Sequence, residues 1–166
     1  MMVRITRTLL RKWGMCWDDE KIALYVPPEG LDSTVVFNWA IPAPEKIWIL
    51  LRPEVLGEKL LGVIDPITDY VVEKYCVSCG NTIIEEWAKK WLSGEDRSET
   101  SAQAVRMIAW DNLGHNATPT WAMRTAINAA QKDAIRAAAT ARGTDKGSDI
   151  EGERQVEIIR QALMRD

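Results

Sequence analysis

The chain has 166 residues, a length that predicts one domain whose core needs no disulfide or metal to hold it together. Its net charge of -3 argues against a general nucleic-acid binder, which usually carries a strongly basic surface. No stretch approaches the roughly 20 apolar residues of a membrane-spanning helix, so we expect no membrane partner.

The first quarter of the chain is predicted to hold two short helices and one ambiguous segment. Residues 5–13 carry apolar side chains at helical spacing, and Gly14 is a natural end for that helix. A second helix is expected over residues 16–26, because acidic residues in its first turn suit the helix dipole. Residues 31–41 have the composition of a strand, but no other alternating segment offers a partner. We therefore favour a short helix or an irregular turn there.

Prolines divide the middle of the chain into further short helices. Pro44 and Pro53 each stand where the first turn of a helix is expected. Asp65 and Pro66 form an N-cap followed by proline at the first helical position, which predicts a helix boundary at this point. The helix that follows is expected to end near Gly80.

Capping signals and glycines mark the helices of the second half of the chain, and one of these helices is unusually rich in alanine. The predicted boundaries are, in chain order, the capping box of Thr82 and Glu85, then Gly94, Ser98, Gly114, Thr118–Pro119, Gly143 and the capping box of Ser148 and Glu151. Val156, Ile159 and Leu163 are expected to line the buried face of the last helix.

These signals predict an all-α protein. We expect a compact bundle of about eight or nine mostly short helices, in which short linkers make neighbours antiparallel. The prediction is a single domain over residues 1–166, with residues 1–42 as an optional small N-terminal subdomain.

The three cysteines and the single histidine raise the question of a metal site. Cys16, Cys76, Cys79 and His115 would supply the four ligands of a structural zinc ion. Only Cys76 and Cys79 have knuckle spacing, however, and they stand at the end of a predicted helix. A redox C-x-x-C pair instead belongs at a helix start, where the dipole lowers the thiol pKa. We therefore expect structural cysteines, no metal and no cofactor.

Catalytic motifs are missing from the sequence, and we predict that the protein is not an enzyme. A Cys–His enzyme centred on His115 stays open as the weakest alternative, because no nucleophile motif flanks that residue. The odd number of cysteines favours a reducing compartment, so a cytoplasmic location is expected.

Three sets of side chains are candidates for contacting a partner. Trp13 and Trp17 flank the helix end at Gly14, and tryptophan is enriched in binding hot spots, although core packing is the commoner role. The densest acidic stretch contains Glu85, Glu86, Glu95, Asp96 and Glu99. The basic N-terminal segment contains Arg4, Arg7, Arg11 and Lys12. An alternative function follows from the basic set, a nucleic-acid-associated regulator, although such charges more often form a solvated face.

Five segments carry a family resemblance: "LLRKWGMCWDDEKIALYVPPEGL", "IPAPEKIWILLRPEVL", "WAKKWLSGE", the Ala-rich "AINAAQKDAIRAAATARG" and the closing "ERQVEIIRQAL". In this order they resemble the Ala- and Trp-rich, all-helical immunity-type small proteins of phages, prophages and bacteria. The Ala-rich region departs from that group, because it is short and "GHNATPT" interrupts it. The resemblance implies an intracellular, non-catalytic protein that binds a toxin or a defence component. No catalytic residue carries over, and a homo-oligomer is left open.

Overall fold

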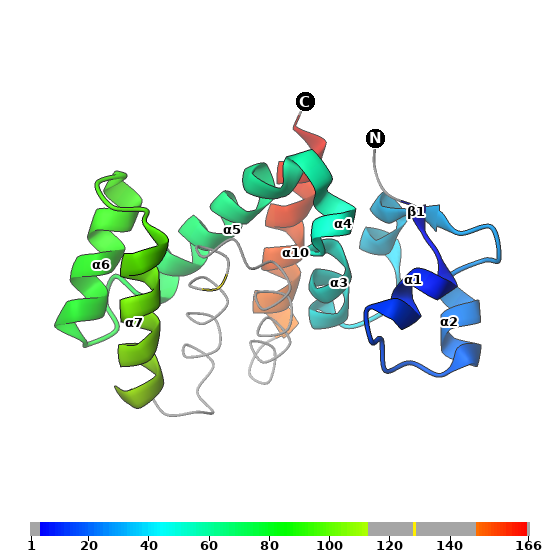
Figure 1. The fold of residues 1–166 in the computed structure, drawn as a ribbon, viewed down its shortest axis with the longest axis horizontal. Coiled ribbons are helices and arrows are strands. Elements are labelled where there is room, and N and C mark those ends of the chain that lie inside the picture. Colours follow the sequence, from blue (N-terminus) through cyan, green and yellow to red (C-terminus); the bar gives the residue numbers. More distant parts are fainter. Residues whose placement is uncertain (1–3, 113–127, 129–148, 166) are drawn as a thin grey trace.

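A computed structural model describes residues 4–112, 128 and 149–165, and these residues are predominantly helical (Figure 1). They form eight α-helices, two 3-10 helices and one two-stranded ladder. The predicted helical class is confirmed at this level. The expected boundaries at Gly114, Thr118–Pro119, Gly143 and Ser148, and the Ala-rich helix itself, lie outside the described residues.

The N-terminal part of the molecule combines short helices with a small ladder. Its elements are β1 (Arg4–Ile5), α1 (Arg7–Lys12), α2 (Asp19–Tyr25), β2 (Leu31–Asp32) and the 3-10 helix η1 (Ser33–Asn38). The two strands pair antiparallel, with Arg4 opposite Asp32 and Ile5 opposite Leu31. The expectation that the segment from residue 31 lacks a strand partner was wrong for its first two residues. The expected short helix is present as the 3-10 helix η1, and residues 39–41 are irregular.

Side-chain caps set the starts of these helices. The Thr6 hydroxyl accepts a hydrogen bond from the Leu9 N–H at 3.1 Å, and the Asp18 carboxylate accepts one from the Lys21 N–H at 2.7 Å. Because Asp18 has an extended backbone, α2 starts three residues later than the sequence predicted. Asp32 accepts bonds from both the hydroxyl and the N–H of Thr34, and these bonds hold the pKa of Asp32 below its usual range.

Gly30 allows the turn before β2 to approach β1 closely. Its φ is +74°, and a Cβ placed there would lie 2.8 Å from the Ile5 carbonyl oxygen. We expect Gly30→Ala to lower the free energy of unfolding by roughly 1–3 kcal/mol, because backbone strain and the clash act together. The matched control is Gly14→Ala, at φ +77° with no atom within 4 Å of the added Cβ, which should cost about 1 kcal/mol. Equal losses for the two variants in urea denaturation would contradict the proposed clash.

Two of the four central elements begin at or next to the predicted prolines. The four elements are α3 (Ala43–Leu50), α4 (Pro53–Leu56), the 3-10 helix η2 (Gly57–Lys59) and α5 (Leu60–Tyr75). Pro44 lies in the first turn of α3, and Pro53 is the first residue of α4. Gly57, at φ +51°, is the residue at which α4 ends.

The predicted helix boundary at Asp65 and Pro66 was wrong, because α5 runs through Pro66 without a break. A proline inside a helix costs about 3 kcal/mol. Val63, Ile64 and Ile67 are all buried, and burying each such side chain stabilises by about 1.5–3 kcal/mol. The apolar face that spans the proline therefore outweighs the lost backbone hydrogen bond.

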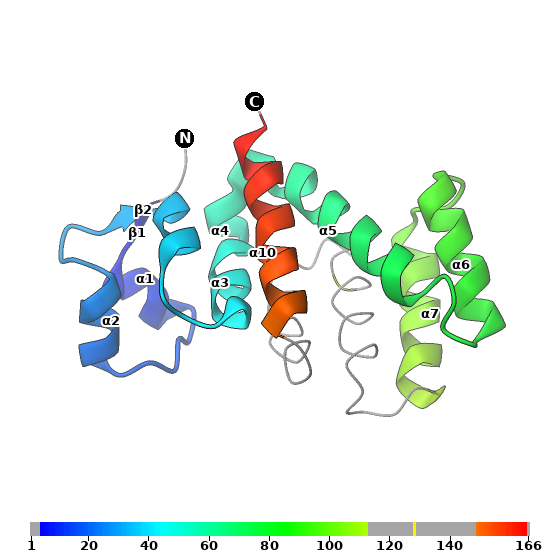
Figure 2. The same ribbon diagram turned by 180° about the vertical axis from the view of Figure 1, so that it is seen from behind.

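Two helices, α6 (Thr82–Ser93) and α7 (Glu99–Asn112), follow α5 and lie side by side (Figures 1 and 2). The N-cap of α6 is Asn81, whose side chain accepts from the N–H groups of Ile83 and Ile84, so the predicted cap at Thr82 was one residue too late. Glu85 still reaches back, and its carboxylate accepts the Gly80 N–H at 2.8 Å. Gly94 ends α6 at φ +79°, as expected.

The last helix, α10 (Asp149–Met164), packs against α3 and α5. Its buried face contains Val156, Ile159 and Leu163, as the sequence predicted. Lys59 of η2 caps its end, because the ammonium group donates to the Leu163 carbonyl at 3.0 Å. The C-terminal end of α10 is thereby tied to the start of α5.

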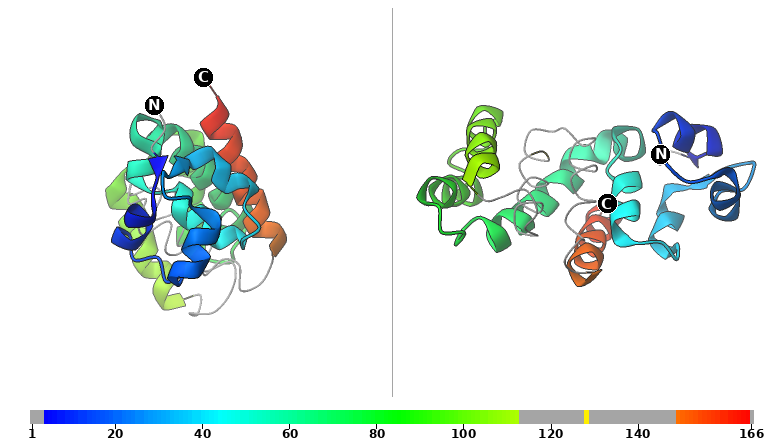
Figure 3. Two further views of the ribbon diagram at one scale, coloured as in Figure 1. Left: turned by 90° about the vertical axis from the view of Figure 1, so that its right-hand side faces the viewer. Right: turned by 90° about the horizontal axis from the view of Figure 1, so that it is seen from below.

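The described elements form a row, with α1 and α2 at one end and α6 and α7 at the other (Figures 1 and 3). Their buried side chains fall into two clusters. The first cluster is shared by the N-terminal elements, α3, the first half of α5 and α10. The second cluster joins the last part of α5 to α6 and α7. The expected compact antiparallel bundle is not confirmed.

Within the described residues, no helix combines the length and the apolar composition that crossing a membrane requires.

Candidate functional site

Of the cysteines predicted as candidate zinc ligands, the structure keeps Cys76 and Cys79 together in one turn and places Cys16 in a different part of the molecule. Cys16 is exposed between α1 and α2, whereas Cys76 ends α5 and Cys79 lies in the turn before α6 (Figure 1). Cys76 is fully buried in the second cluster, and Cys79 packs partly buried against it. His115 lies outside the described residues. No group of three or more metal-ligating side chains occurs in the part of the chain that the structure describes.

The Cys76 thiol is held protonated by its surroundings. Burial raises its pKa well above the ordinary value, and the neighbouring Cys79 adds to the effect. A protonated, enclosed thiol is a poor nucleophile and a poor metal ligand in this state.

This raised pKa predicts a loss of stability at alkaline pH. Above the ordinary thiol pKa of about 8.5, the unfolded chain releases the Cys76 proton, whereas the folded chain keeps it. The free energy of unfolding is therefore unaffected by Cys76 ionisation below this pH and falls above it. Above that pH, we expect the free energy of unfolding of the wild type to fall more steeply than that of Cys76→Ala, by up to about 1.4 kcal/mol per pH unit. Urea denaturation at a series of pH values measures the difference. Parallel profiles would contradict the interpretation.

Three of the four basic N-terminal residues make contacts within the chain. The Arg7 Nε donates to the Val26 carbonyl at 2.6 Å, and an Arg4 terminal nitrogen donates to the Gly30 carbonyl at 3.3 Å. Arg11 donates to the Trp17 carbonyl at 2.6 Å and forms an ion pair with Asp19. These guanidinium groups hold the loops around α2 in place.

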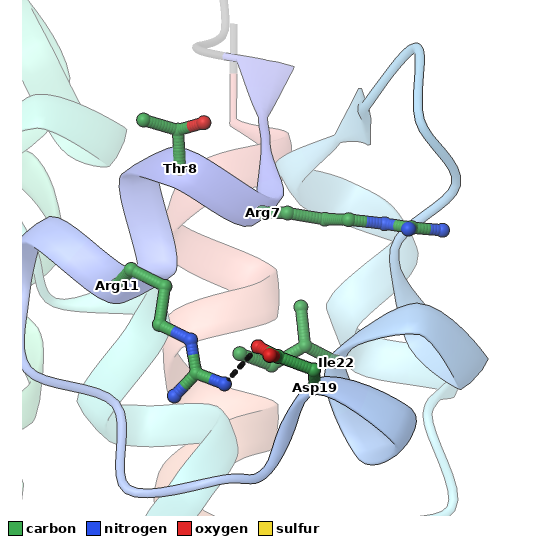
Figure 4. Close-up of a pocket in the computed structure, with 5 residues that line it drawn as sticks. All are labelled: Arg7, Thr8, Arg11, Asp19 and Ile22. Atoms are coloured by element: carbon green, nitrogen blue, oxygen red, sulfur yellow. Dashed lines mark hydrogen bonds and ion pairs between the residues drawn. The ribbon is translucent and has the colours of Figure 1, made fainter.

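A hollow of about 340 Å³ lies beside these arginines and is lined by Arg7, Thr8, Arg11, Asp19 and Ile22. Figure 4 shows that Arg11 points toward Asp19, whereas Arg7 and Thr8 point in other directions. Asp19 also neutralises one of the two guanidinium charges. The side chains do not converge on one point, as they would around a bound phosphate.

The Arg11 contacts predict a structural role that its neighbour lacks. We expect Arg11→Ala to lower the free energy of unfolding by about 1 kcal/mol. This is the value of a charge-assisted hydrogen bond after a reduction for solvent screening, because the Arg11 side chain is 43% exposed. Lys12→Ala, on the exposed side of α1, should change it by no more than about 0.5 kcal/mol. Thermal denaturation of both variants tests this, and equal effects would show that the contacts contribute nothing measurable.

The two tryptophans offered as partner anchors both pack within the first cluster. Trp17 is buried, with its ring centroid 5.4 Å from that of Tyr25 and 6.2 Å from that of Trp39. Trp13 is partly buried and stands edge-on to Trp48, with ring centroids 6.4 Å apart. The Trp13 indole N–H also donates to Glu54 at 3.1 Å.

The five acidic candidates fall at two separate places on the α6–α7 pair. Glu85 and Glu86 lie near the start of α6, whereas Glu95, Asp96 and Glu99 lie around the loop that leads to α7. From Glu86 to the last residue of α6, Ser93, the helical rise alone covers roughly 10 Å. The sequence stretch therefore does not fold into one continuous acidic patch.

Two of the five acids have local structural roles. Glu85 accepts the Gly80 N–H, and Asp96 accepts the Ser98 N–H at 2.8 Å. Hydrogen bonds from the Ser98 side chain and backbone hold the pKa of Asp96 below its usual range. Glu86, Glu95 and Glu99 are exposed and make no ion pair within the described residues.

Two exposed apolar side chains on the same pair of helices were not among the residues predicted from the sequence. Ile83 is 56% exposed on α6, and Met107 is 55% exposed on α7. Ile83 lies outside the buried stripe of α6, which is made by Ile84, Trp87, Ala88 and Trp91. The spacing of these four residues at i, i+3, i+4 and i+7, which Ile83 does not share, was the available signal in the sequence.

A polar network fixes the α6–α7 pair to α5. Asp69 of α5 accepts the Trp91 indole N–H at 2.8 Å and forms an ion pair with Arg97 at 3.1 Å. The Arg97 Nε also donates to the Trp91 carbonyl at 3.1 Å. These contacts reach both the end of α6 and the loop before α7, so the pair is oriented by more than apolar packing.

A second hollow, of about 660 Å³, lies between α5 and α10. Tyr70 and Glu73 line it from α5, and Arg154 and Ile158 line it from α10. The Arg154 guanidinium lies 5.7 Å from the centre of the Tyr70 ring. Its acidic and basic groups are mixed, so its charge favours no single class of ligand.

Comparisons with known proteins add no function to these observations. The similarity to immunity-type helical proteins therefore stays a prediction, and any functional proposal rests on the residues described above. No family model matches the chain, and no curated protein or solved structure is significantly similar to it.

Proposed function

We propose that the chain is a non-catalytic protein-binding module of the phage or prophage type. It acts as an inhibitor, an immunity protein or an anti-defence protein that occludes a toxin or a defence component. The observation that carries the proposal is that the α6–α7 pair exposes both apolar side chains, Ile83 and Met107, and acidic side chains on the same two helices. The proposal places the protein in the cytoplasm, since its three free cysteines suit a reducing compartment.

The chemistry of this surface favours a basic protein partner. Protein interfaces combine an apolar centre with a polar rim, and Ile83 and Met107 supply exposed apolar area. Glu86, Glu95 and Glu99 supply exposed negative charge on the same two helices, although Lys89 and Lys90 are exposed there too. The net charge of the chain is also negative, which would speed encounter with a basic toxin, such as a nuclease.

The described thiols support a non-catalytic role. Cys76 is enclosed and protonated, so it is poorly suited to nucleophilic attack. Cys16 is exposed in the loop between α1 and α2, and these helices lie at the opposite end of the row from α6 and α7 (Figure 2).

The nucleic-acid alternative gains no support from the basic N-terminal segment. Arg4, Arg7 and Arg11 donate to carbonyl groups of the chain, and Arg11 is also paired with Asp19. A phosphate-binding surface would instead present converging free guanidinium groups.

The experiment is a growth-rescue screen followed by binding measurements. The chain is co-expressed with a panel of basic nuclease toxins, and any toxin that it neutralises is purified for calorimetric titration. We expect the triple variant Glu86→Ala, Glu95→Ala, Glu99→Ala to bind about tenfold or more weakly than the wild type. Glu85 and Asp96 are left unchanged, because their hydrogen bonds stabilise the fold.

The matched control changes three exposed acids elsewhere, as Glu20→Ala, Glu29→Ala, Glu58→Ala. It alters the net charge by the same amount as the first triple variant. A difference in affinity between the two variants therefore reports the local effect of the α6–α7 surface and not the general effect of net charge. Equal affinities for the two triple variants would rule out the α6–α7 pair as the binding surface. Failure to neutralise any toxin of the panel would count against a basic toxin as partner.

A further inference from the structure

The turn that joins α5 to α6 contains two thiols with different environments. Cys76 is the residue at which α5 ends, and its N–H donates to the Val72 carbonyl at 2.9 Å. Cys79 follows three residues later, and its Sγ donates to the Asn81 carbonyl at 3.8 Å. Both side chains pack in the second cluster, where Cys76 is enclosed and Cys79 is partly exposed.

The spacing of the two residues in the sequence is close to what a disulfide requires. Cys76 has right-handed helical dihedral angles, and residues three apart in such a turn have Cβ atoms about 5–6 Å apart. A disulfide requires about 3.5–4.5 Å between these atoms, so a small adjustment of the turn is sufficient. Gly80 follows directly at φ +82°, a conformation that glycine adopts without strain.

We propose that Cys76 and Cys79 are a redox modification site, which a low-molecular-weight disulfide such as oxidised glutathione converts to an intrachain disulfide. In the first step, the Cys79 thiolate attacks one sulfur of the reagent, forms a mixed disulfide and releases one glutathione thiolate. In the second step, the Cys76 sulfur attacks the Cys79 sulfur and releases the second glutathione thiolate, which takes up the proton of Cys76. The cysteine pair loses two electrons, and the reagent gains them.

The exposure of the two thiols sets the order of these steps. Cys79 is reached by the reagent first, because Cys76 has no exposed surface. The second step is slow, because the Cys76 thiol must lose its proton in an enclosed site. The bond would join the end of α5 to the turn that carries α6, and this inference does not depend on the proposed function.

The test uses the reduced full-length protein under native conditions with oxidised glutathione. Intact-mass spectrometry should show a chain lighter by two hydrogen atoms, about 2 Da, beside any glutathione carried by exposed Cys16. Peptide mapping without reductant should link Cys76 to Cys79. Reduced glutathione should reverse the change.

Variants distinguish the two steps. Cys76→Ser, or Cys76→Ala if the serine variant does not fold, should stop at one glutathione on Cys79. Cys79→Ser should leave Cys76 unmodified. The proposal is overturned if the wild-type Cys79 keeps its glutathione without forming a disulfide, if Cys79 is linked to Cys16, or if both thiols stay reduced.

Discussion

Trp91→Ala is expected to lower the free energy of unfolding by roughly 3–5 kcal/mol, the largest effect of any substitution considered for this chain. The Trp91 ring is 2% exposed and lies 5.6 Å from the Trp87 ring, measured between centroids. It belongs to the smaller of the two apolar clusters, so its loss leaves a cavity that few neighbours can fill. Its indole N–H also donates to Asp69, which links α6 to α5. Urea denaturation followed by far-ultraviolet circular dichroism measures the change.

Two further variants separate packing from hydrogen bonding at Trp91. Trp91→Phe keeps most of the apolar volume but loses the N–H donor, and it should cost about 1–3 kcal/mol. Met107→Ala removes an exposed side chain from the same pair of helices and should stay within about 0.5 kcal/mol of the wild type. If Met107→Ala and Trp91→Ala had similar effects, the second cluster would not be the core that we describe.

Ile159→Ala is the second large effect that we expect, at roughly 2–5 kcal/mol. Ile159 has no exposed surface, and it stands on the face of α10 that packs against α3 and α5. It packs α10 against helices more than 90 residues earlier in the chain, so its truncation weakens the packing between α10 and the rest of the first cluster. The measurement is the shift of the urea midpoint at constant denaturant slope.

The control for Ile159 lies on the same helix. Ile150 is 83% exposed, so Ile150→Ala makes the same chemical change without removing a core contact. It should alter the free energy of unfolding by no more than about 0.5 kcal/mol. A loss of more than about 2 kcal/mol for Ile150→Ala would mean that the described packing of α10 is wrong.

Local signals in the sequence were sufficient for most helix boundaries. Pro44 and Pro53 act through a fixed φ and Gly94 through its tolerance of a positive φ; these properties hold in any surroundings, and the predicted positions are confirmed. The buried face of α10 was also predictable, because apolar residues at helical spacing need one partner surface.

The errors arose where distant packing decides the outcome. Pro66 is a helix breaker locally, yet the buried residues around it keep α5 continuous. The pairing of β1 with β2 depends on the close approach at Gly30, which no periodic pattern announces. Neither feature is visible in a short window of sequence.

The candidate binding surfaces also combine features that the sequence predicts with features that only tertiary contacts decide. Composition identified the acidic stretch, but only the structure shows that its residues fall at two places and that the carboxylates of Glu85 and Asp96 accept backbone N–H groups. The basic segment looked available for phosphate until Arg7 and Arg11 were found to hold loop carbonyls. The number of charged residues in a segment does not show which of their side chains are already hydrogen-bonded within the folded chain.

The continuity of α5 has a consequence for cooperativity. Its first half contributes to one apolar cluster and its second half to the other, so a single hydrogen-bonded ladder couples two units of unequal size. Pro66 lies in the first half and lacks the N–H that would complete this ladder. Local opening that begins in the smaller cluster can therefore stop before it reaches the larger one, and the α6–α7 pair can exchange its amide protons while the other helices stay folded.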